Sequence, residues 1–118
     1  AILFNKKKKF YLSEKIELIE FSNLPGFEDL PYVFGNPQEF KIFYNNLIRT
    51  KFPFNHIKKY TFYETNRWDL ETVDRKVIKL PSKNYIESID SYLNIKNKNE
   101  FKKYTVFDYR IANQLILK

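Results

Sequence analysis

The chain of 118 residues has no cysteine, two glycines and one histidine. Without cysteine it can form neither a disulfide framework nor a thiolate site, and its cellular compartment stays open. Gly26 and Gly35 alone cannot build a phosphate-binding loop or a dinucleotide-binding fingerprint. His56 has no second histidine or carboxylate at the spacing of a metal site, so we expect it in a loop or at the start of a strand and not as a ligand.

Groups that could carry catalysis are also few. The chain has five serines, scattered along the sequence, and acidic neighbours such as Glu28 and Asp29 fall in an expected loop. A sugar-processing enzyme that uses Asp69 or Asp108 as its acid is an alternative that no motif supports, since it needs two carboxylates that converge in a cleft. We therefore expect no enzyme, no cofactor and no metal.

Long uncharged stretches are missing. One of the longest, residues 21–27, is far too short for a membrane-spanning helix or the core of a signal peptide. Apolar residues nevertheless make up 43% of the chain and aromatic residues 19%, which is typical of a folded protein and not of a disordered one. We expect a single domain over residues 1–118, because two independent folding units would be cramped.

The net charge is +7, which by itself suggests a nucleic acid or an acidic membrane as partner. Lysine, asparagine, isoleucine, phenylalanine and tyrosine make up more than half of the chain, against four arginines and two alanines. All five have A/T-rich codons, so we interpret the excess of lysine mainly as a drift in base composition. A basic nucleic-acid-binding domain remains the alternative function, because aromatic rings are available for stacking on bases.

The first thirty residues predict short strands and turns. Residues 1–4 and 10–12 are apolar and flank the basic run from Lys6 to Lys9, which indicates a hairpin with a basic, solvent-exposed turn. A phosphate-binding patch is the alternative for the four lysines. A further strand is expected at residues 16–21, and the prolines and glycine of residues 23–31 predict a loop.

Two helices are predicted by their start signals and apolar stripes. Asn36 and Glu39 form a capping box, and the apolar residues that follow recur at helical spacing until Pro53 ends the segment. The residues of this stripe, which we expect in the core, are Phe40, Phe43, Tyr44, Leu47 and Ile48. Asn84 and Glu87 form a second capping box. The apolar face of the second helix comprises Tyr85, Ile86, Ile89, Tyr92 and Leu93.

Between and after the helices the apolar period changes to two. The expected strands are residues 57–65, 67–72, 77–80, 104–111 and 114–118. Asn66 predicts a turn, and Trp68, Leu70 and Thr72 alternate with polar residues, so we expect them on the buried face. The order of strands, helix, strands, helix, strands predicts an α+β fold, a largely antiparallel, twisted β-sheet with two amphipathic helices packed on it.

Five segments, in sequence order, resemble the β-domain of the FtsQ/DivIB family of bacterial cell-division proteins. They are residues 1–5, residues 30–35, the first capped helix, residues 66–70 (Asn-Arg-Trp-Asp-Leu) with Leu-Pro at 80–81, and residues 105–110 (Thr-Val-Phe-Asp-Tyr-Arg). The family has tryptophan where Phe4 stands and leucine where Tyr109 stands, and its Asp-Gly turns are replaced here by Glu14-Lys15 and Asp74-Arg75. These departures keep the alternation of the strands intact.

The resemblance implies a non-catalytic scaffold domain that binds an FtsB/FtsL-type divisome partner during septum formation. It implies a place in the periplasm at the division septum, with a cytoplasmic tail, one inner-membrane helix and a POTRA domain before residue 1. In the family the partner binds largely by adding a strand to the last strand of the sheet. The residues implied for partner binding are Arg110, Ile111, Gln114, Leu115, Ile116 and Leu117.

The same residues also have a purely structural interpretation. Leu115, Ile116 and Leu117 can be core residues of a strand whose edge other sequence covers, and Arg110 can cap the sheet by pairing with a local carboxylate. Against this, residues 114–117 carry no proline or charge of the kind that normally protects an exposed edge. We therefore expect this edge to bind a partner strand.

Overall fold

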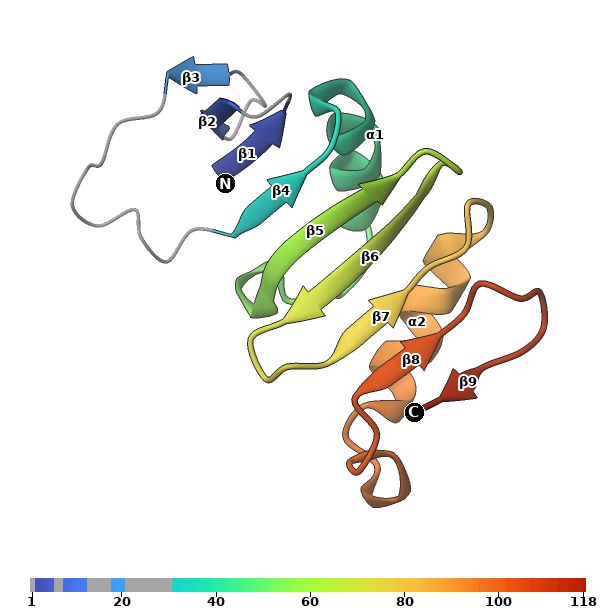
Figure 1. Ribbon diagram of the computed structural model, residues 1–118. Helices are drawn as coiled ribbons and strands as arrows, with labels where there is room; N and C mark the ends of the chain where they lie inside the picture. The colour runs from blue at the N-terminus through green and yellow to red at the C-terminus, as the bar shows by residue number, and fades with distance from the viewer. Residues whose placement is uncertain (1, 6–7, 13–17, 21–30) are drawn as a thin grey trace.

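The computed structural model describes residues 2–5, 8–12, 18–20 and 31–118, which form one sheet with two helices on one of its faces (Figure 1). The nine strands of this described part lie in the order β3-β2-β1-β4-β5-β6-β7-β8-β9. The strands are β1 Ile2–Asn5, β2 Lys8–Leu12, β3 Leu18–Glu20, β4 Tyr32–Phe34, β5 Ile57–Tyr63, β6 Arg67–Thr72, β7 Val77–Lys79, β8 Val106–Asp108 and β9 Ile116–Leu117. The helices are α1 Pro37–Leu47 and α2 Tyr85–Ile95, with 3-10 helices η1 Phe54–His56 and η2 Asn99–Phe101.

The sheet is mixed. The α+β class with two helices is confirmed. Five of the eight described strand pairs are antiparallel, but the sheet is not purely antiparallel, because β1–β4, β4–β5 and β7–β8 are parallel pairs. Two of the parallel pairs follow from helical connections: α1 joins β4 to β5, and α2 joins β7 to β8. A helix between two strands carries the chain back to the end of the sheet from which it started, so the two strands run parallel.

The predicted N-terminal hairpin is confirmed, since β1 and β2 pair antiparallel from Ile2↔Tyr11 to Asn5↔Lys8. Lys8 and Lys9 belong to strand β2, so the basic run is not wholly a turn. Its first two lysines, and nearly all of the loop expected at residues 23–31, lie outside the described residues.

Helix α1 begins as its sequence predicts. The Asn36 side chain accepts hydrogen bonds from the main-chain N–H groups of Gln38 at 2.8 Å and Glu39 at 3.3 Å. The helix buries Phe40, Phe43 and Leu47 against the sheet. It ends at Leu47, well before the proline expected to end it, and Ile48 is 49% exposed and does not join the core. The helix end is closed by Thr50, whose main-chain N–H and hydroxyl both donate to the Leu47 carbonyl, at 2.9 and 2.7 Å.

Helix α2 begins differently from its prediction. Asn84 has a left-handed backbone with φ of 60° and makes no side-chain cap hydrogen bond, so the second capping box is wrong. An N-cap side chain normally reaches the first-turn amides from an extended backbone, which Asn84 does not have. The apolar stripe itself is confirmed, because Ile89 and Tyr92 are buried and the other three residues of the predicted face pack against the core.

The core lies between the helices and the sheet and is centred on β6. Trp68, Leu70 and Thr72 are all at most 5% exposed, as their alternation predicts. The Trp68 ring stacks on Phe43, with 5.2 Å between ring centroids. Gly35 directly follows β4 and lies next to Phe62 and Trp68. Its φ is 151°, and a Cβ atom at this position would lie 2.6 Å from the Phe62 Cβ, so the position requires glycine.

No helix in the described ranges is long and apolar enough to cross a membrane.

Candidate functional site

Strand β9 is the last strand of the sheet and the place of the predicted partner site. It pairs with β8 through Phe107↔Leu117 and Asp108↔Ile116, and no described strand pairs with its other edge (Figure 1). The strand contains only Ile116 and Leu117, so the prediction of a strand over residues 114–118 was too long. Strand β8 is likewise shorter than the predicted residues 104–111.

The hydrogen bonds between β8 and β9 decide which main-chain groups reach the outer edge. Val106 and Lys118 exchange both of their main-chain hydrogen bonds, each at 3.1 Å. In an antiparallel pair, such residues alternate with residues whose main chain points away from the partner strand. Ile116 therefore turns its N–H and C=O toward β8. The N–H and C=O of Leu117 point the other way, to the edge that no described strand occupies.

The predicted partner-binding side chains divide into two groups. Leu115 and Leu117 are half-buried and pack against the core, so the structural interpretation holds for these two side chains. Ile111 and Ile116 are 51% and 36% exposed, and Gln114 is exposed as well. The Gln114 N–H donates to the Ile111 carbonyl at 3.1 Å and closes the turn that leads into β9. The side chains of Leu115 and Leu117 thus hold the segment against the core, while the main chain of Leu117 faces outward at the edge of the sheet.

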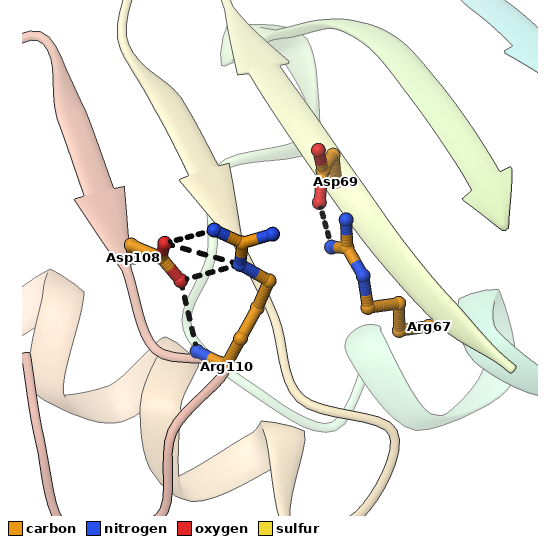
Figure 2. A network of polar contacts seen from close by, with 4 residues as sticks. All are labelled: Arg67, Asp69, Asp108 and Arg110. Atoms are coloured by element: carbon orange, nitrogen blue, oxygen red, sulfur yellow. Dashed lines mark hydrogen bonds and ion pairs between the residues drawn. The ribbon is translucent and has the colours of Figure 1, made fainter. Parts of the chain in front are cut away.

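Two ion pairs lie on the face of the sheet opposite the helices, which we call the open face, one on β6 and one next to β9 on β8 (Figure 2). Arg67 pairs with Asp69 on β6, and Asp108 of β8 pairs with Arg110. Each pair joins residues two apart in an extended chain, which share one face of a sheet. Arg110 donates from Nε at 2.9 and 3.0 Å, from Nη2 at 2.6 Å and from its main-chain N–H at 3.0 Å, all to the Asp108 carboxylate.

The open face carries charges of alternating sign across three strands. The register places Asp69 opposite Lys79, and Lys79 opposite Asp108. The hydrogen bonds from Arg110 lower the pKa of Asp108 from 3.8 to about 2, with burial acting against them and Lys79 adding to the effect. Asp108 is therefore a fixed carboxylate at neutral pH. A general acid requires a raised pKa, so Asp108 does not suit the role of the acid.

Arg110 adopts the local pairing that was one of its two interpretations. Asp108 is only 5% exposed at its side chain, whereas the Arg110 side chain is 42% exposed. The bonds to Asp108 use Nε and Nη2, and Nη1 has no partner among the described residues (Figure 2). The i, i+2 spacing of Asp108 and Arg110 in an extended chain could have indicated this ion pair. The sequence analysis expected a local carboxylate for Arg110 but did not identify it as Asp108. Arg110 is thus both a structural residue and an exposed cation.

A hollow of about 630 Å³ lies between helix α2 and the segment that leads into β9. Ser88 and Ser91 line it from the helix, and Tyr109 and Leu115 line it from the other side. The Ser91 and Tyr109 hydroxyls are 3.3 Å apart, and burial raises the pKa of Tyr109. Sequence reasoning missed the helix residues, because no local pattern links them to a strand more than twenty residues later.

His56 and the acidic residues form no metal site in the part of the chain that the structure describes. His56 is exposed at the end of η1, and its carbonyl accepts a hydrogen bond from the Val73 N–H at 2.8 Å. It lies just before β5, at the strand start where the sequence analysis expected it.

Comparison of the chain with models of known protein families and with curated protein sequences found no matching family and no matching protein.

Proposed function

We propose that this is a non-catalytic scaffold domain of the FtsQ/DivIB kind, which binds an FtsB/FtsL-type partner by strand addition to the outer edge of β9. The proposal includes the location that the resemblance implies, on the periplasmic side of the inner membrane at the division septum. The observation that carries it is the main chain of Leu117, whose N–H and C=O point to an edge that no described strand covers.

The lack of edge protection supports this proposal. An exposed strand edge recruits other strands unless proline, charge or a bulge protects it. No proline or charge occurs from Gln114 to Leu117, and Lys118 is the charged residue that directly follows this segment. Because Leu115 and Leu117 pack against the core, the segment is already held in place before a partner arrives. Less conformational entropy is lost when a binding edge is held in this way.

Arg110 supports the choice of an acidic partner segment. Asp108 holds its guanidinium on the open face, on the side of β8 that faces β7 and β6, and Nη1 is available there to a carboxylate of a partner that reaches over this face (Figure 2). A charge reversal, Arg110→Glu, would place a second carboxylate next to the buried Asp108 and destabilise the fold. Arg110→Gln is the cleaner variant, and we expect it to weaken partner binding about tenfold or less.

The proposal is tested by methylating single main-chain amides, which removes one N–H and keeps the side chain. The two amides to be methylated, those of Leu117 and Ile116, lie close to Lys118, so each methyl group can be introduced by ligation of a synthetic peptide. N-methylation at Leu117 should weaken binding of the FtsB-type protein from the parent organism at least about tenfold, because a lost hydrogen bond and steric blockage together cost about 1.4 kcal/mol or more. The melting temperature should stay close to that of the unmodified chain.

N-methylation at Ile116 is the matched control, because it breaks a bond to β8 and should lower the melting temperature of the free domain. Unchanged affinity after methylation at Leu117 would place the interface elsewhere. If the two modifications lowered the melting temperature of the free domain equally, the assignment of the Ile116 amide to β8 and of the Leu117 amide to the outer edge would be wrong. A salt series adds a separate check, since binding by main-chain hydrogen bonds depends on ionic strength far less than binding to a polyanion.

A further inference from the structure

The cationic side chains of residues 31–118 gather at one end of the sheet. Ten of the sixteen lie in residues 48–58, 73–76, 95–106 and 118, which together we call the basic end. The same segments contain two acidic residues, Asp74 and Glu100. The rest of residues 31–118 has six cationic and seven acidic residues, so all of the net positive charge of this part belongs to the basic end.

Hydrogen bonds join neighbours among these four segments, which are far apart in the sequence. The Val73 N–H donates to the His56 carbonyl at 2.8 Å, and Lys76 Nζ donates to the Lys102 carbonyl at 2.8 Å. The Thr105 N–H donates to the Lys118 carbonyl, also at 2.8 Å. In Figure 1 this is the end where β5 and β8 begin, where β6 and β9 end and where α2 ends.

A drift in base composition does not explain this placement, because it would add lysine evenly over the surface. Eight of the ten cations of the basic end are exposed, and none pairs with a carboxylate within the described ranges. Arg49, Lys51 and Lys96 line a hollow of about 710 Å³ between the ends of the two helices, and Asp90 is the acidic residue of its lining. Unpaired, clustered charges of one sign repel one another, and an anionic partner would relieve that repulsion.

The other exposed side chains at the basic end indicate which anion fits. Ile48 and Val73, 49% and 58% exposed, stand beside arginines at positions 49 and 75. Aliphatic side chains among cations are typical of protein surfaces that contact anionic lipid headgroups and the acyl chains below them. A nucleic acid is the other common anionic partner, but stacking on its bases requires accessible rings. At the basic end Phe52 is buried, and Phe101 and Tyr104 are half-buried, so these three rings do not favour nucleic acid.

We propose that the basic end docks on an anionic phospholipid surface. Its cations bind lipid phosphates and carboxylates, and Val73 and Ile48 contact the apolar layer beneath the headgroups. This inference is independent of strand addition, because the main chain of the β9 edge takes no part in it.

The test measures sedimentation of the 118-residue chain with vesicles of equimolar phosphatidylcholine and phosphatidylserine, and with vesicles of phosphatidylcholine alone. The unmodified chain should bind the first and not the second, and less at higher salt. Lys98→Glu with Lys102→Glu should weaken binding about 25-fold, since each lysine near an anionic surface contributes about fivefold. The matched control, Lys41→Glu with Lys83→Glu, makes the same change in net charge with exposed lysines outside the basic end and should weaken binding about threefold or less.

A second variant tests the apolar contact. Val73→Ser should weaken vesicle binding severalfold without changing binding of the FtsB-type protein. Equal losses for the two double variants would overturn the proposal, because general charge and not the basic end would then drive binding. It would also be overturned if a single-stranded or duplex oligonucleotide bound more tightly than the vesicles and Lys98→Glu with Lys102→Glu abolished that binding. That outcome would assign the basic end to nucleic acid instead.

Discussion

Replacing Asp108 with asparagine should remove a stabilising interaction that depends on pH. Asparagine has nearly the same shape and can still accept the hydrogen bond from the Arg110 main-chain N–H, but it carries no charge. The substitution therefore isolates the ionic part of the contact between Asp108 and Arg110, the contact that holds the Arg110 cation on the open face.

The size of the effect follows from the lowered pKa. The pKa of Asp108 falls from 3.8 to about 2 on folding, which corresponds to at most about 2.5 kcal/mol of stability. Because the Arg110 side chain is 42% exposed, solvent screening reduces this value, and we expect about 1 to 2 kcal/mol. A lowered pKa means that the contribution is fully present above the unfolded value of 3.8 and is lost as the pH falls through about 2.

Chemical denaturation of both proteins from pH 6 down to pH 2 tests this reasoning. The free energy of unfolding of the unmodified chain should exceed that of Asp108→Asn by about 1 to 2 kcal/mol at pH 6, and the difference should shrink toward zero near pH 2. Asp90→Asn, a change of an exposed carboxylate on α2, should stay within about 0.5 kcal/mol throughout. A difference that is the same at both ends of the pH range would refute the role of the charge.

Two further predictions concern the fold. Trp68→Ala should cost about 3 to 5 kcal/mol of unfolding free energy, because the ring is 5% exposed and stacks on Phe43, and Trp68→Phe should cost clearly less; similar melting curves for Trp68→Ala and the unmodified chain would contradict this. Asn36→Ala should cost about 1 kcal/mol because its side chain caps α1. Asn84→Gly should stay within about 0.5 kcal/mol, because Asn84 makes no cap bond and glycine adopts its φ of 60° readily; comparable losses at both asparagines in thermal denaturation would argue against the difference between the caps.

Features that depend on neighbours in the sequence could be predicted. The cap at Asn36 needs only the two amides that follow it, and the alternation around Trp68 needs only the period of an extended chain. The α+β class, both helices and most strands followed from such local patterns. The candidate site was also located from the sequence, because the resemblance of residues 105–110 to a family strand pointed to the C-terminal edge.

Features that depend on distant residues could not be predicted. The pairing of β4 with β5 and of β7 with β8 is parallel because each helix crosses back over the sheet, and the period of a strand is the same in parallel and antiparallel sheets. Asn84 has the sequence of a cap, but the turn from β7 into α2 places it in a left-handed conformation that local preference does not specify.

The sequence by itself determined which residues are apolar on one face, where the helices begin, and that segment 114–117 carries no protection against strand pairing. Only the tertiary structure decided that the Leu117 amide, and not that of Ile116, reaches the outer edge, because this depends on the register between β8 and β9. It also decided that the excess charge gathers at one end of the sheet. Lysines in four separate segments become neighbours only when the strands and helices bring their ends together.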